Sequence, residues 1–415
     1  MNNISVTHVS YAVSHQTASF RLHNELAKTI DSNIFTSTKS IKSNLIIQPI
    51  SLFEKFTAKF CLLRELIISI IFPNSKIAYF SYNIGPVLIQ SFWLNKLFKL
   101  NSKIFHLHWI GNGFLNLNQI GKIKQPIVIT LHDVWFITGG CHVNFECKKY
   151  ESGCDKCPMF EHKFNPLNIT KKIFNKKVNI FKNKNIQIVV LSQWMKDIVT
   201  MSPIFTNASV NLIPNGVNLD IFTPIDKNFA RSKFSINLDK KIILYGGISA
   251  KSDHNKGYDL LIDCINLLNI KDMEIVVFGE TTSSQYFLAG YKVTSVGYLS
   301  NEIDLAKLYS AVDIVIVPSR QESFSQVSLE AISCGTPVVA FDYSGPRDII
   351  KHKVNGYLAK PYDPKDLANG IDWIFDSLSK SNELSIKARE IATQKFDITN
   401  VAKSHVDLYN KILLN

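Results

Sequence analysis

The stretch KIILYGGISAKSDHNKGYDLLIDCINLL, residues 241–268, decides the fold class of this chain. It begins with an apolar run, turns through Gly246 and Gly247, and ends in a segment whose apolar residues recur with helical spacing. A buried strand that leads through a tight glycine turn into a helix is typical of a doubly wound α/β sheet. Lys256 and Gly257 directly precede the helix, and a lysine beside a helix N-terminus suits phosphate binding. Taken alone, this lysine is as well explained by simple solvation.

The same alternation of apolar runs and amphipathic helical stretches continues in both directions. Further strands are predicted at SKIFHLHWI (102–110), PIVITLHD (126–133) and IQIVVLS (186–192) before the segment, and at MEIVVFGE (273–280), DIVIVPS (313–319) and TPVVAFD (336–342) after it. Their apolar character is expected when helices cover both faces of a parallel sheet. Two series of this kind predict an α/β protein with two Rossmann-like domains.

The chain length and one interruption of the pattern locate the domains. A chain of 415 residues is longer than one core usually serves. Proline and Asn-Gly break the periodicity in NLIPNGVNLDIFTP, residues 211–224. We predict a first domain over 1–210, a second over 211–395, and a C-terminal helix over 396–415 that packs back on the first domain. Ligands of open parallel sheets bind beyond the carboxyl ends of the strands, so we expect the ligand in a cleft between the domains.

The net positive charge of the chain comes entirely from the first half of the sequence. Residues 1–220 contain 24 Lys and Arg against 11 Asp and Glu, whereas residues 221–415 contain 22 against 23. Such an excess predicts a polyanionic partner, either nucleic acid or an anionic membrane surface. Because the sequence has no nucleic-acid-binding motif, we expect no nucleic-acid partner.

Residues 52–72, LFEKFTAKFCLLRELIISIIF, are predicted to form an amphipathic helix. The favoured interpretation is a helix that covers its own sheet, and the alternative is an interfacial helix on a membrane. Basic residues of the docking face would then be Lys55, Lys59, Arg64, Lys96 and Lys99. The sequence start does not resemble a signal peptide, and no apolar run reaches the roughly 20 residues of a spanning helix. We therefore expect a cytoplasmic protein, with a peripheral location on the inner face of the membrane as a refinement.

Two carboxylates flank a predicted helix in QESFSQVSLEAISCGTPVVA, residues 321–340. Glu322 follows a buried strand, Ser323 or Ser325 would cap the helix, and Glu330 lies about two turns into it. Carboxylates on one rim can accept hydrogen bonds from sugar hydroxyls, and the N–H groups at the helix start can meet a diphosphate. The spacing alone does not favour this interpretation over two structural glutamates.

The wider pattern does favour it, because the sequence resembles the retaining GT-B glycosyltransferases, specifically glycosyltransferase family 4. The resemblance covers most of residues 242–372. It is carried by the pair Glu322 and Glu330 and by the segments NKGYDLL, CGTPVVA, YSGPRDII and NGYLAKPYDPKDLANGI. It implies a GT-B fold, in which two Rossmann-like domains face each other across a cleft.

The resemblance also implies roles for matched residues. Glu322 would contact the donor sugar, Glu330 the nucleotide ribose, and Lys256 the diphosphate. The implied donor-binding residues are Gly246, Gly247, Lys256, Glu322, Ser323, Phe324, Ser325 and Glu330. Lys256 and the helix N-terminus would stabilise the charge that develops on the leaving diphosphate, so catalysis requires no metal or other cofactor.

Two departures from the family pattern stand out. The family usually has an arginine at the place of Gly247, where it pairs with the lysine on phosphate. Here charge neutralisation would depend more on Lys256 and the helix dipoles, or on Arg320 or His254. The family also has two glycines after the first strand, whereas this chain has the loop Ser14–Ser19 after SVTHVSYAV.

A second distinctive region lies in the first half, over residues 104–160. It resembles members of family 4 found in bacterial exopolysaccharide and O-antigen clusters. His132 and Asp133 end a buried strand, and the resemblance places His132 by the donor sugar as a catalytic residue. His108 and Trp109 end the preceding strand and, with Asp133, are acceptor-side candidates. A structural hydrogen bond for His132, and core packing for His108 and Trp109, are the competing interpretations.

Four cysteines cluster in the same region, at Cys141, Cys147, Cys154 and Cys157. Disulfides are unexpected without a secretory signal. The Cys-Asp-Lys-Cys spacing is typical of half a structural zinc site, in which His142 could replace a cysteine. Packed thiols are an equally favoured interpretation.

These patterns predict a hexosyltransferase that moves a sugar from a nucleotide sugar to a glycan acceptor with retention of configuration. The implied acceptor is a lipid-linked oligosaccharide in the synthesis of O-antigen, capsule, lipopolysaccharide or exopolysaccharide. The alternative is a non-catalytic GT-B protein that binds sugar nucleotides or acts as an assembly partner. The altered loop Ser14–Ser19 and the glycine at 247 support the alternative.

Overall fold

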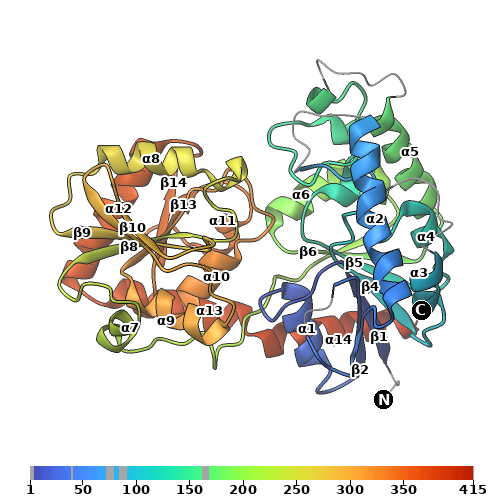
Figure 1. The fold of residues 1–415 in the computed structure, drawn as a ribbon, viewed down its shortest axis with the longest axis horizontal. Helices are drawn as coiled ribbons and strands as arrows, with labels where there is room; N and C mark the ends of the chain where they lie inside the picture. The colour runs from blue at the N-terminus through green and yellow to red at the C-terminus, as the bar shows by residue number, and fades with distance from the viewer. Residues whose placement is uncertain (1–3, 39–40, 72–78, 84–90, 161–167, 415) are drawn as a thin grey trace. The chain divides into compact units, whose positions relative to one another are not determined.

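A computed structural model describes residues 4–38, 41–71, 79–83, 91–160 and 168–414. The chain divides into two compact units, each built around its own sheet (Figure 1). Unit 1 comprises Met1–Pro214 and Ala402–Asn415, and unit 2 comprises Asn215–Val401. The sequence-based boundaries fall near the same two points of the chain, after residue 210 and after residue 395.

Unit 1 contains a seven-stranded parallel sheet in the order β3-β2-β1-β4-β5-β6-β7. Its strands are β1 (Ser5–Ser10), β2 (Asp31–Thr36), β3 (Ile46–Ile47), β4 (Ile104–Leu107), β5 (Ile127–Leu131), β6 (Ile186–Val190) and β7 (Ser209–Leu212). Its helices are α1 (Ala18–Leu26), α2 (Leu52–Ile71), α3 (Ser91–Phe98), α4 (Leu117–Lys122), α5 (Ile169–Phe181) and α6 (Gln193–Met201). The reversal of strand order at β1 is that of a doubly wound sheet.

Unit 2 also contains a seven-stranded doubly wound sheet, in the order β10-β11-β9-β8-β12-β13-β14. It differs from unit 1 in that β11 lies between β10 and β9, and only β10 is antiparallel to its neighbour. Its strands are β8 (Lys241–Gly246), β9 (Met273–Phe278), β10 (Ser284–Leu288), β11 (Tyr291–Ser295), β12 (Ile314–Val317), β13 (Val338–Phe341) and β14 (Gly356–Ala359). Its helices are α7 (Lys227–Lys233), α8 (Tyr258–Leu267), α9 (Glu302–Ala311), α10 (Gln326–Ser333), α11 (Pro346–Ile349), α12 (Pro364–Lys380) and α13 (Glu383–Phe396).

The last helix, α14 (Ile398–Leu414), passes from unit 2 into unit 1 at Ala402. In unit 1 its Tyr409 is fully buried, and the Tyr409 hydroxyl lies 2.7 Å from Nδ1 of His106 in β4. The C-terminal segment therefore contributes to the core of the first unit.

The seven strands predicted on either side of the interdomain segment are confirmed, and so is the α/β fold with two doubly wound units. The short strands β2, β3, β7, β10, β11 and β14 were not predicted. Burial explains part of the difference, since β5, β6 and β12 are almost wholly buried whereas β10 is largely exposed.

Helix α2 confirms the predicted helix over 52–72, of which residue 72 lies outside the described residues. One expectation about its surface is wrong. Arg64 was assigned to a basic docking face, but it is buried and donates from Nη2 to the carbonyl of Gly113 at 3.0 Å. Of the other docking-face candidates, Lys59, Lys96 and Lys99 are exposed and Lys55 is half-buried. No helix in the described part of the chain is long and apolar enough to cross a bilayer.

Candidate active site

In unit 2, glycines bring the turns at the carboxyl ends of the central strands close together. Gly246 ends β8 with a φ of +156°, and a Cβ there would lie 2.3 Å from the carbonyl oxygen of Phe278 in β9. Gly257 has a φ of +69°, and its Cβ would lie 2.0 Å from the carbonyl oxygen of Pro318 after β12. Only glycine fits either position. Gly246 allows the end of β8 to lie close to β9, and Gly257 allows the lysine-bearing turn to lie against the end of β12.

The short distance between these turns brings two predicted site residues into contact. Nζ of Lys256 lies 2.9 Å from Oε1 of Glu322, and the Ser319 hydroxyl donates to the same oxygen at 2.8 Å. The Glu322 carboxylate raises the pKa of Lys256, which is therefore a cation at neutral pH. About a third of the Lys256 side chain (32%) is exposed, so the ammonium remains accessible to an anionic ligand.

The loop that carries Glu322 is anchored by the YSGPRDII segment. The backbone N–H of Glu322 donates to the Ser344 hydroxyl at 3.0 Å, and the N–H of Gly345 donates to the carbonyl of Glu322 at 2.8 Å. A Cβ at Gly345 would lie 2.7 Å from that carbonyl. The segment thus holds the backbone of the carboxylate in place.

Helix α10 starts as predicted from the capping pattern, with Ser325 at the N-cap and its hydroxyl accepting from the N–H of Ser328 at 3.3 Å. The side chains of Phe324 and Ser325 are buried, and the Phe324 ring packs 5.8 Å from the ring of Phe396. Any contact of Phe324 or Ser325 with a donor would therefore use the backbone. The side chain of Ser323 is half-buried.

Glu330 lies one turn into α10, not two, because the helix begins only at Gln326. Its carboxylate is buried and accepts a hydrogen bond from the Tyr309 hydroxyl at 2.9 Å. Glu330 and Glu322 therefore both belong to the β12–α10 connection and its helix, but the structure records no direct bond between them.

A cavity of about 810 Å³ opens at the carboxyl ends of β8 and β9. In the sheet, β8 is the neighbour of β12, the strand that precedes Glu322. Gly247 lines the cavity, as do Lys251, Glu280 and Tyr286, which the sequence analysis missed. Lys251 forms an ion pair with Glu280 and lies 4.4 Å from the Tyr286 ring centroid. Glu280 is the last residue of the predicted strand 273–280, so the rule that ligands meet strand ends could have identified it.

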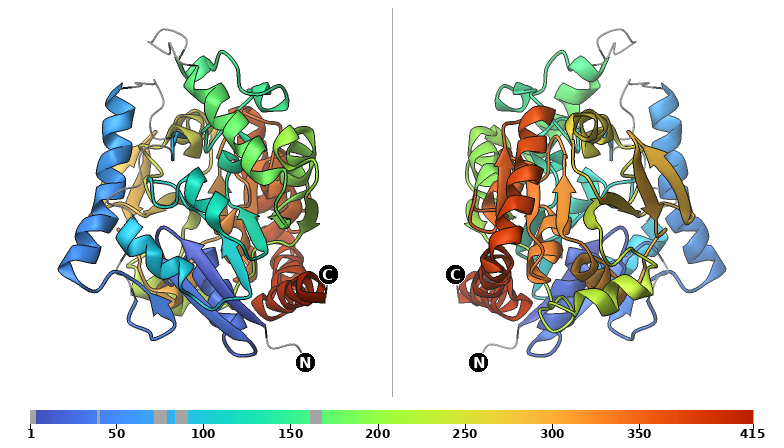
Figure 2. Two further views of the ribbon diagram at one scale, coloured as in Figure 1. Left: turned by 90° about the vertical axis from the view of Figure 1, so that its right-hand side faces the viewer. Right: turned by 90° about the vertical axis from the view of Figure 1, so that its left-hand side faces the viewer.

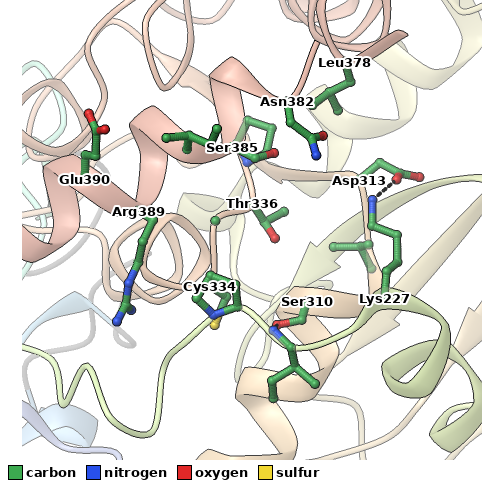
Figure 3. A pocket seen from close by; sticks show the side chains of 16 residues that line it. Lys227, Ser310, Asp313, Cys334, Thr336, Leu378, Asn382, Ser385, Arg389 and Glu390 are labelled. Atoms are coloured by element: carbon green, nitrogen blue, oxygen red, sulfur yellow. Dashed lines mark hydrogen bonds and ion pairs between the residues drawn. The ribbon is translucent and has the colours of Figure 1, made fainter.

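A second cavity of unit 2, about 530 Å³ in volume, is shown in Figure 3. Lys227 and Asp313 form an ion pair of 2.6 Å in its wall. Asp313 and Pro337 precede β12 and β13, so this cavity lies at the amino ends of the strands. Because parallel sheets bind ligands at the opposite edge, we do not assign the donor to it.

Gly247, at the place where the family usually has an arginine, has free space around it. Gly247 has a φ of +136°, and a Cβ there would meet nothing within 4 Å. Arg320, one proposed substitute, is held by Asp259 through both terminal nitrogens and donates to the carbonyl of His254 at 2.7 Å. The Arg320 guanidinium is thus already bonded within unit 2. Lys256 therefore remains the predicted cation for a donor phosphate at the ligand edge.

In unit 1, the predicted residues form two connected groups at the carboxyl ends of β4 and β5. Nε2 of His132 lies 2.9 Å from Nδ1 of His108. Asp133 and Trp109 meet through His142, whose Nδ1 lies 2.6 Å from Oδ2 of Asp133 and 3.4 Å from Nε1 of Trp109. Burial alone would raise the pKa of Asp133, but His142 and the Trp135 N–H lower it overall.

The four cysteines of the cluster form no disulfide among the described residues, and Cys141, Cys154 and Cys157 are buried. Nδ1 of His142 lies 2.6 Å from Oδ2 of Asp133 and its Nε2 lies 2.7 Å from the Ser81 hydroxyl, so His142 could replace a cysteine ligand only if one of these bonds breaks. Cys141, Cys147 and Cys157 line one cavity of about 220 Å³, while Sγ of Cys154 accepts from the N–H of Gly139 at 3.1 Å. Within the described ranges, no three of these sulfurs lie close enough together to share an ion.

Structural zinc stays a prediction, and it has a direct test. Elemental analysis of protein purified without added metal should find about one zinc per chain if the four cysteines are ligands. Absence of zinc, together with four thiols that react with an alkylating reagent, would leave only the packed arrangement.

Known proteins share sequence and fold with the chain around these candidate site residues. Residues 226–391 match the family model of glycosyl transferases group 1. This range contains Lys256, Glu322, Glu330 and the 810 Å³ cavity. The chain is 30% identical over 236 residues to an uncharacterised glycosyltransferase of Methanocaldococcus jannaschii, a match that covers 54% of this chain and 59% of that protein. The chain spans about half the length of the curated relatives it matches.

Solved structures share the fold over the whole chain. Sucrose-phosphate synthase from Thermosynechococcus elongatus superposes with a TM-score of 0.68 at 19% identity and covers 99% of both chains. Anabaena Alr3699/HepE, solved in complex with UDP and glucose, has a TM-score of 0.66 at 14% identity and covers 98% of this chain and all of that one. The two-unit α/β fold is therefore that of GT-B glycosyltransferases.

Proposed function

We propose that this protein transfers a sugar from a nucleotide-sugar donor to a glycan acceptor, with retention of configuration. The observation that carries the proposal is the Lys256–Glu322 pair. It lies inside the range that matches glycosyl transferases group 1, at the sheet edge where ligands of such sheets bind. The complex of the Anabaena protein with UDP and glucose supports a nucleotide-sugar donor.

In this proposal the ammonium of Lys256 binds the diphosphate and stabilises the negative charge that grows on it as the glycosidic bond breaks. Glu322 accepts hydrogen bonds from hydroxyls of the donor sugar. Its Oε1 is held by Lys256 and Ser319, so its orientation is fixed before the donor arrives. Glu330 binds the ribose, and Tyr309 orients its carboxylate. In unit 1, His132 binds a substrate oxygen. The leaving phosphate takes the acceptor proton, so no side chain is assigned as a general base.

A transfer assay tests the activity. Wild-type protein is incubated with mixed UDP-, GDP-, ADP- and dTDP-sugars and with lipid-linked oligosaccharide acceptors, and released nucleotide is measured. The proposal expects nucleotide release from one donor class, which falls on substitution Lys256→Met. Binding of a donor without release or transfer would favour the non-catalytic alternative, which the glycine at 247 supports.

We further propose that the acceptor is lipid-linked and that unit 1 docks on an anionic membrane through α2. The burial of side chains along this helix is the reverse of that in a usual amphipathic helix. Its buried face carries Arg64 and Glu65, whereas its exposed face carries large apolar side chains. The exposed fractions are 85% for Leu52, 54% for Phe53, 59% for Phe56, 51% for Leu63, 51% for Leu66 and 77% for Ile70.

The buried charged residues of α2 form hydrogen bonds inside unit 1. Arg64 donates to Gly113, and a Glu65 carboxylate oxygen accepts from the N–H of Asn83 at 3.2 Å. The orientation of the helix is therefore fixed by polar contacts, and its large apolar side chains are left exposed. Figure 2 shows α2 as a long helix at the outer side of unit 1. A large exposed apolar stripe flanked by lysines is typical of a helix that lies in the membrane interface. Lys55 and Lys59 also line a cavity of about 430 Å³ beside α2.

Vesicle co-sedimentation of the full chain at about 150 mM salt tests the docking, since the Debye length is then about 8 Å and only close contacts persist. Leu63→Glu with Leu66→Glu should reduce binding to anionic vesicles at least tenfold. The matched control is Leu267→Glu, which alters a leucine of unit 2 that is 56% exposed. Equal loss in the control, or no binding by the wild type, would reject docking through α2.

A further inference from the structure

Six histidines gather in the core of unit 1, and three of them form a continuous chain of hydrogen bonds. Nδ1 of His8 in β1 lies 2.9 Å from Nε2 of His108, and Nδ1 of His108 lies 2.9 Å from Nε2 of His132. His8 and His108 are buried, whereas His132 is half-buried at the end of β5. The chain therefore runs from the interior of the sheet to the edge that carries the candidate site.

All three rings are neutral at physiological pH. Burial lowers the pKa of His132 to about 4 and lowers the pKa values of His8 and His108 well below their ordinary value. A neutral imidazole has one N–H donor and one lone pair. The direction of one hydrogen bond in the chain therefore fixes the direction of the other.

Only two proton arrangements satisfy both bonds. In the first, His8 donates from Nδ1 to His108, and His108 donates from Nδ1 to His132. In the second, both bonds reverse, and the proton of His8 must then lie on Nε2. That nitrogen is buried and has no hydrogen-bond partner among the described residues. An orphaned buried N–H is rarer in proteins than an acceptor without a partner, so the first arrangement is favoured.

The first arrangement has a consequence at the site. Nε2 of His132 accepts from His108, so the one proton of His132 must lie on Nδ1. We propose that the chain His8–His108–His132 fixes His132 in its Nδ1–H tautomer, so that the ring offers a hydrogen-bond donor, not a base, to a ligand oxygen. The tautomer is a property of the folded chain. Only the identity of the oxygen, a hydroxyl or phosphate oxygen of a sugar substrate, rests on the proposed function.

A bound metal ion is the competing use of these rings. Ligand atoms of His8, His106 and His108 lie within 4.8 Å of one another, the only such group in the described ranges. However, Nδ1 of His106 lies 2.7 Å from the Tyr409 hydroxyl and its Nε2 lies 2.7 Å from the Thr130 hydroxyl. Both nitrogens of His108 are also bonded, so a metal would have to break several hydrogen bonds that the sheet already satisfies.

Long-range ¹H–¹⁵N spectra of the full chain labelled with ¹⁵N-histidine test the proposal. The His132 signals are assigned by their loss in His132→Gln. At pH 7.5 we expect His132 to show a protonated Nδ1 and a bare Nε2. The opposite pair of shifts would overturn the proposal, and so would shifts of His8 and His108 that change after a chelator removes a metal.

Two variants separate positioning from mere packing. His108→Leu removes the donor, and we expect the His132 signals to move toward a mixture of the two tautomers. His108→Gln has a side-chain amide that can donate in place of the ring, and we expect it to keep the Nδ1–H tautomer. Identical spectra of His132 in both variants would contradict a role for His108. If His108→Leu does not fold, the wild-type shifts decide alone. Failure of sugar transfer would leave this result untouched and would count only against the proposed function.

Discussion

The two units both have doubly wound sheets, which differ in strand order only at the edge where unit 2 carries the β10–β11 hairpin, but they have opposite chemistry at their carboxyl edges. In unit 2 the edge is charged, with Lys256 paired to Glu322 and Lys251 paired to Glu280. In unit 1 the corresponding edge is neutral at His108 and His132, whose rings burial holds uncharged, and the Asp133 carboxylate beside them is paired with His142. Topology therefore decides where a site forms, and the side chains at the strand ends decide what it binds. The charged edge suits a diphosphate, and the neutral edge suits hydroxyl groups.

The largest effect is expected at the charged edge. Lys256→Met should lower kcat/KM by roughly 10²–10³-fold, about 2.7–4 kcal/mol, because the charge that develops on the leaving group loses its main cation. Steady-state kinetics with the preferred donor measures this. Lys271→Met is the matched control, since Lys271 is an exposed lysine of unit 2 outside both cavities. An equal loss in both variants would mean that Lys256 has no specific role.

At the neutral edge, the effect of replacing His132 should depend on whether the new side chain can donate a hydrogen bond. His132→Leu should lower kcat/KM by about 100-fold, since a hydrogen bond made in the transition state is lost. His132→Gln can still donate from its amide and should stay within about tenfold of the wild type. Similar losses in the two variants would indicate that His132 acts as a base, contrary to the contrast between the two edges.

A smaller effect is expected on donor binding at α10. Glu330→Gln should weaken nucleotide affinity by about 1–3 kcal/mol, the usual cost of losing a charged hydrogen-bond partner. Tyr309→Phe removes the 2.9 Å bond to Glu330 but keeps the carboxylate, so it should weaken affinity less. Calorimetric titration of both folded variants checks this. Unchanged affinity in Glu330→Gln would refute the assignment to the ribose.

The buried histidines of unit 1 also predict how the stability of the fold depends on pH. Burial lowers the pKa values of His23 and His132 to about 4, from 6.5 in the unfolded chain. Unfolding therefore takes up protons below pH 6.5, and the stability that these neutral rings contribute is lost as pH falls toward 4. Each ring should cost about 1.4 kcal/mol per pH unit over that window at most.

Urea unfolding at pH 7 and pH 5 measures this effect. His23→Gln should make the loss of stability between the two pH values smaller. The control is His15→Gln, because the His15 side chain is exposed. A difference of stability between pH 7 and pH 5 that is the same in both variants and the wild type would show that buried histidines do not set it.

The sequence predicted the charged edge better than the neutral one. Lys256 and Glu322 each stand in a local motif beside a glycine turn or a strand end, and such motifs are visible in the sequence. The role of His8 was not predictable, because it depends on the register that pairs His8 with His106 across β1 and β4. The side chain of Arg64 was misplaced for a related reason. Helical spacing identified an amphipathic helix, but it could not show that the polar face would be the buried one.

Donor binding tests the central claim most directly. The melting temperature of the wild type and of Lys256→Met is measured against UDP-, GDP-, ADP- and dTDP-sugars over a range of concentrations. The account predicts that one nucleotide class raises the melting temperature of the wild type with increasing concentration, since a ligand that binds only the folded state stabilises it. It also predicts that Lys256→Met needs far more of that donor for the same shift. No shift with any nucleotide sugar, or an equal shift in both proteins, would contradict the account.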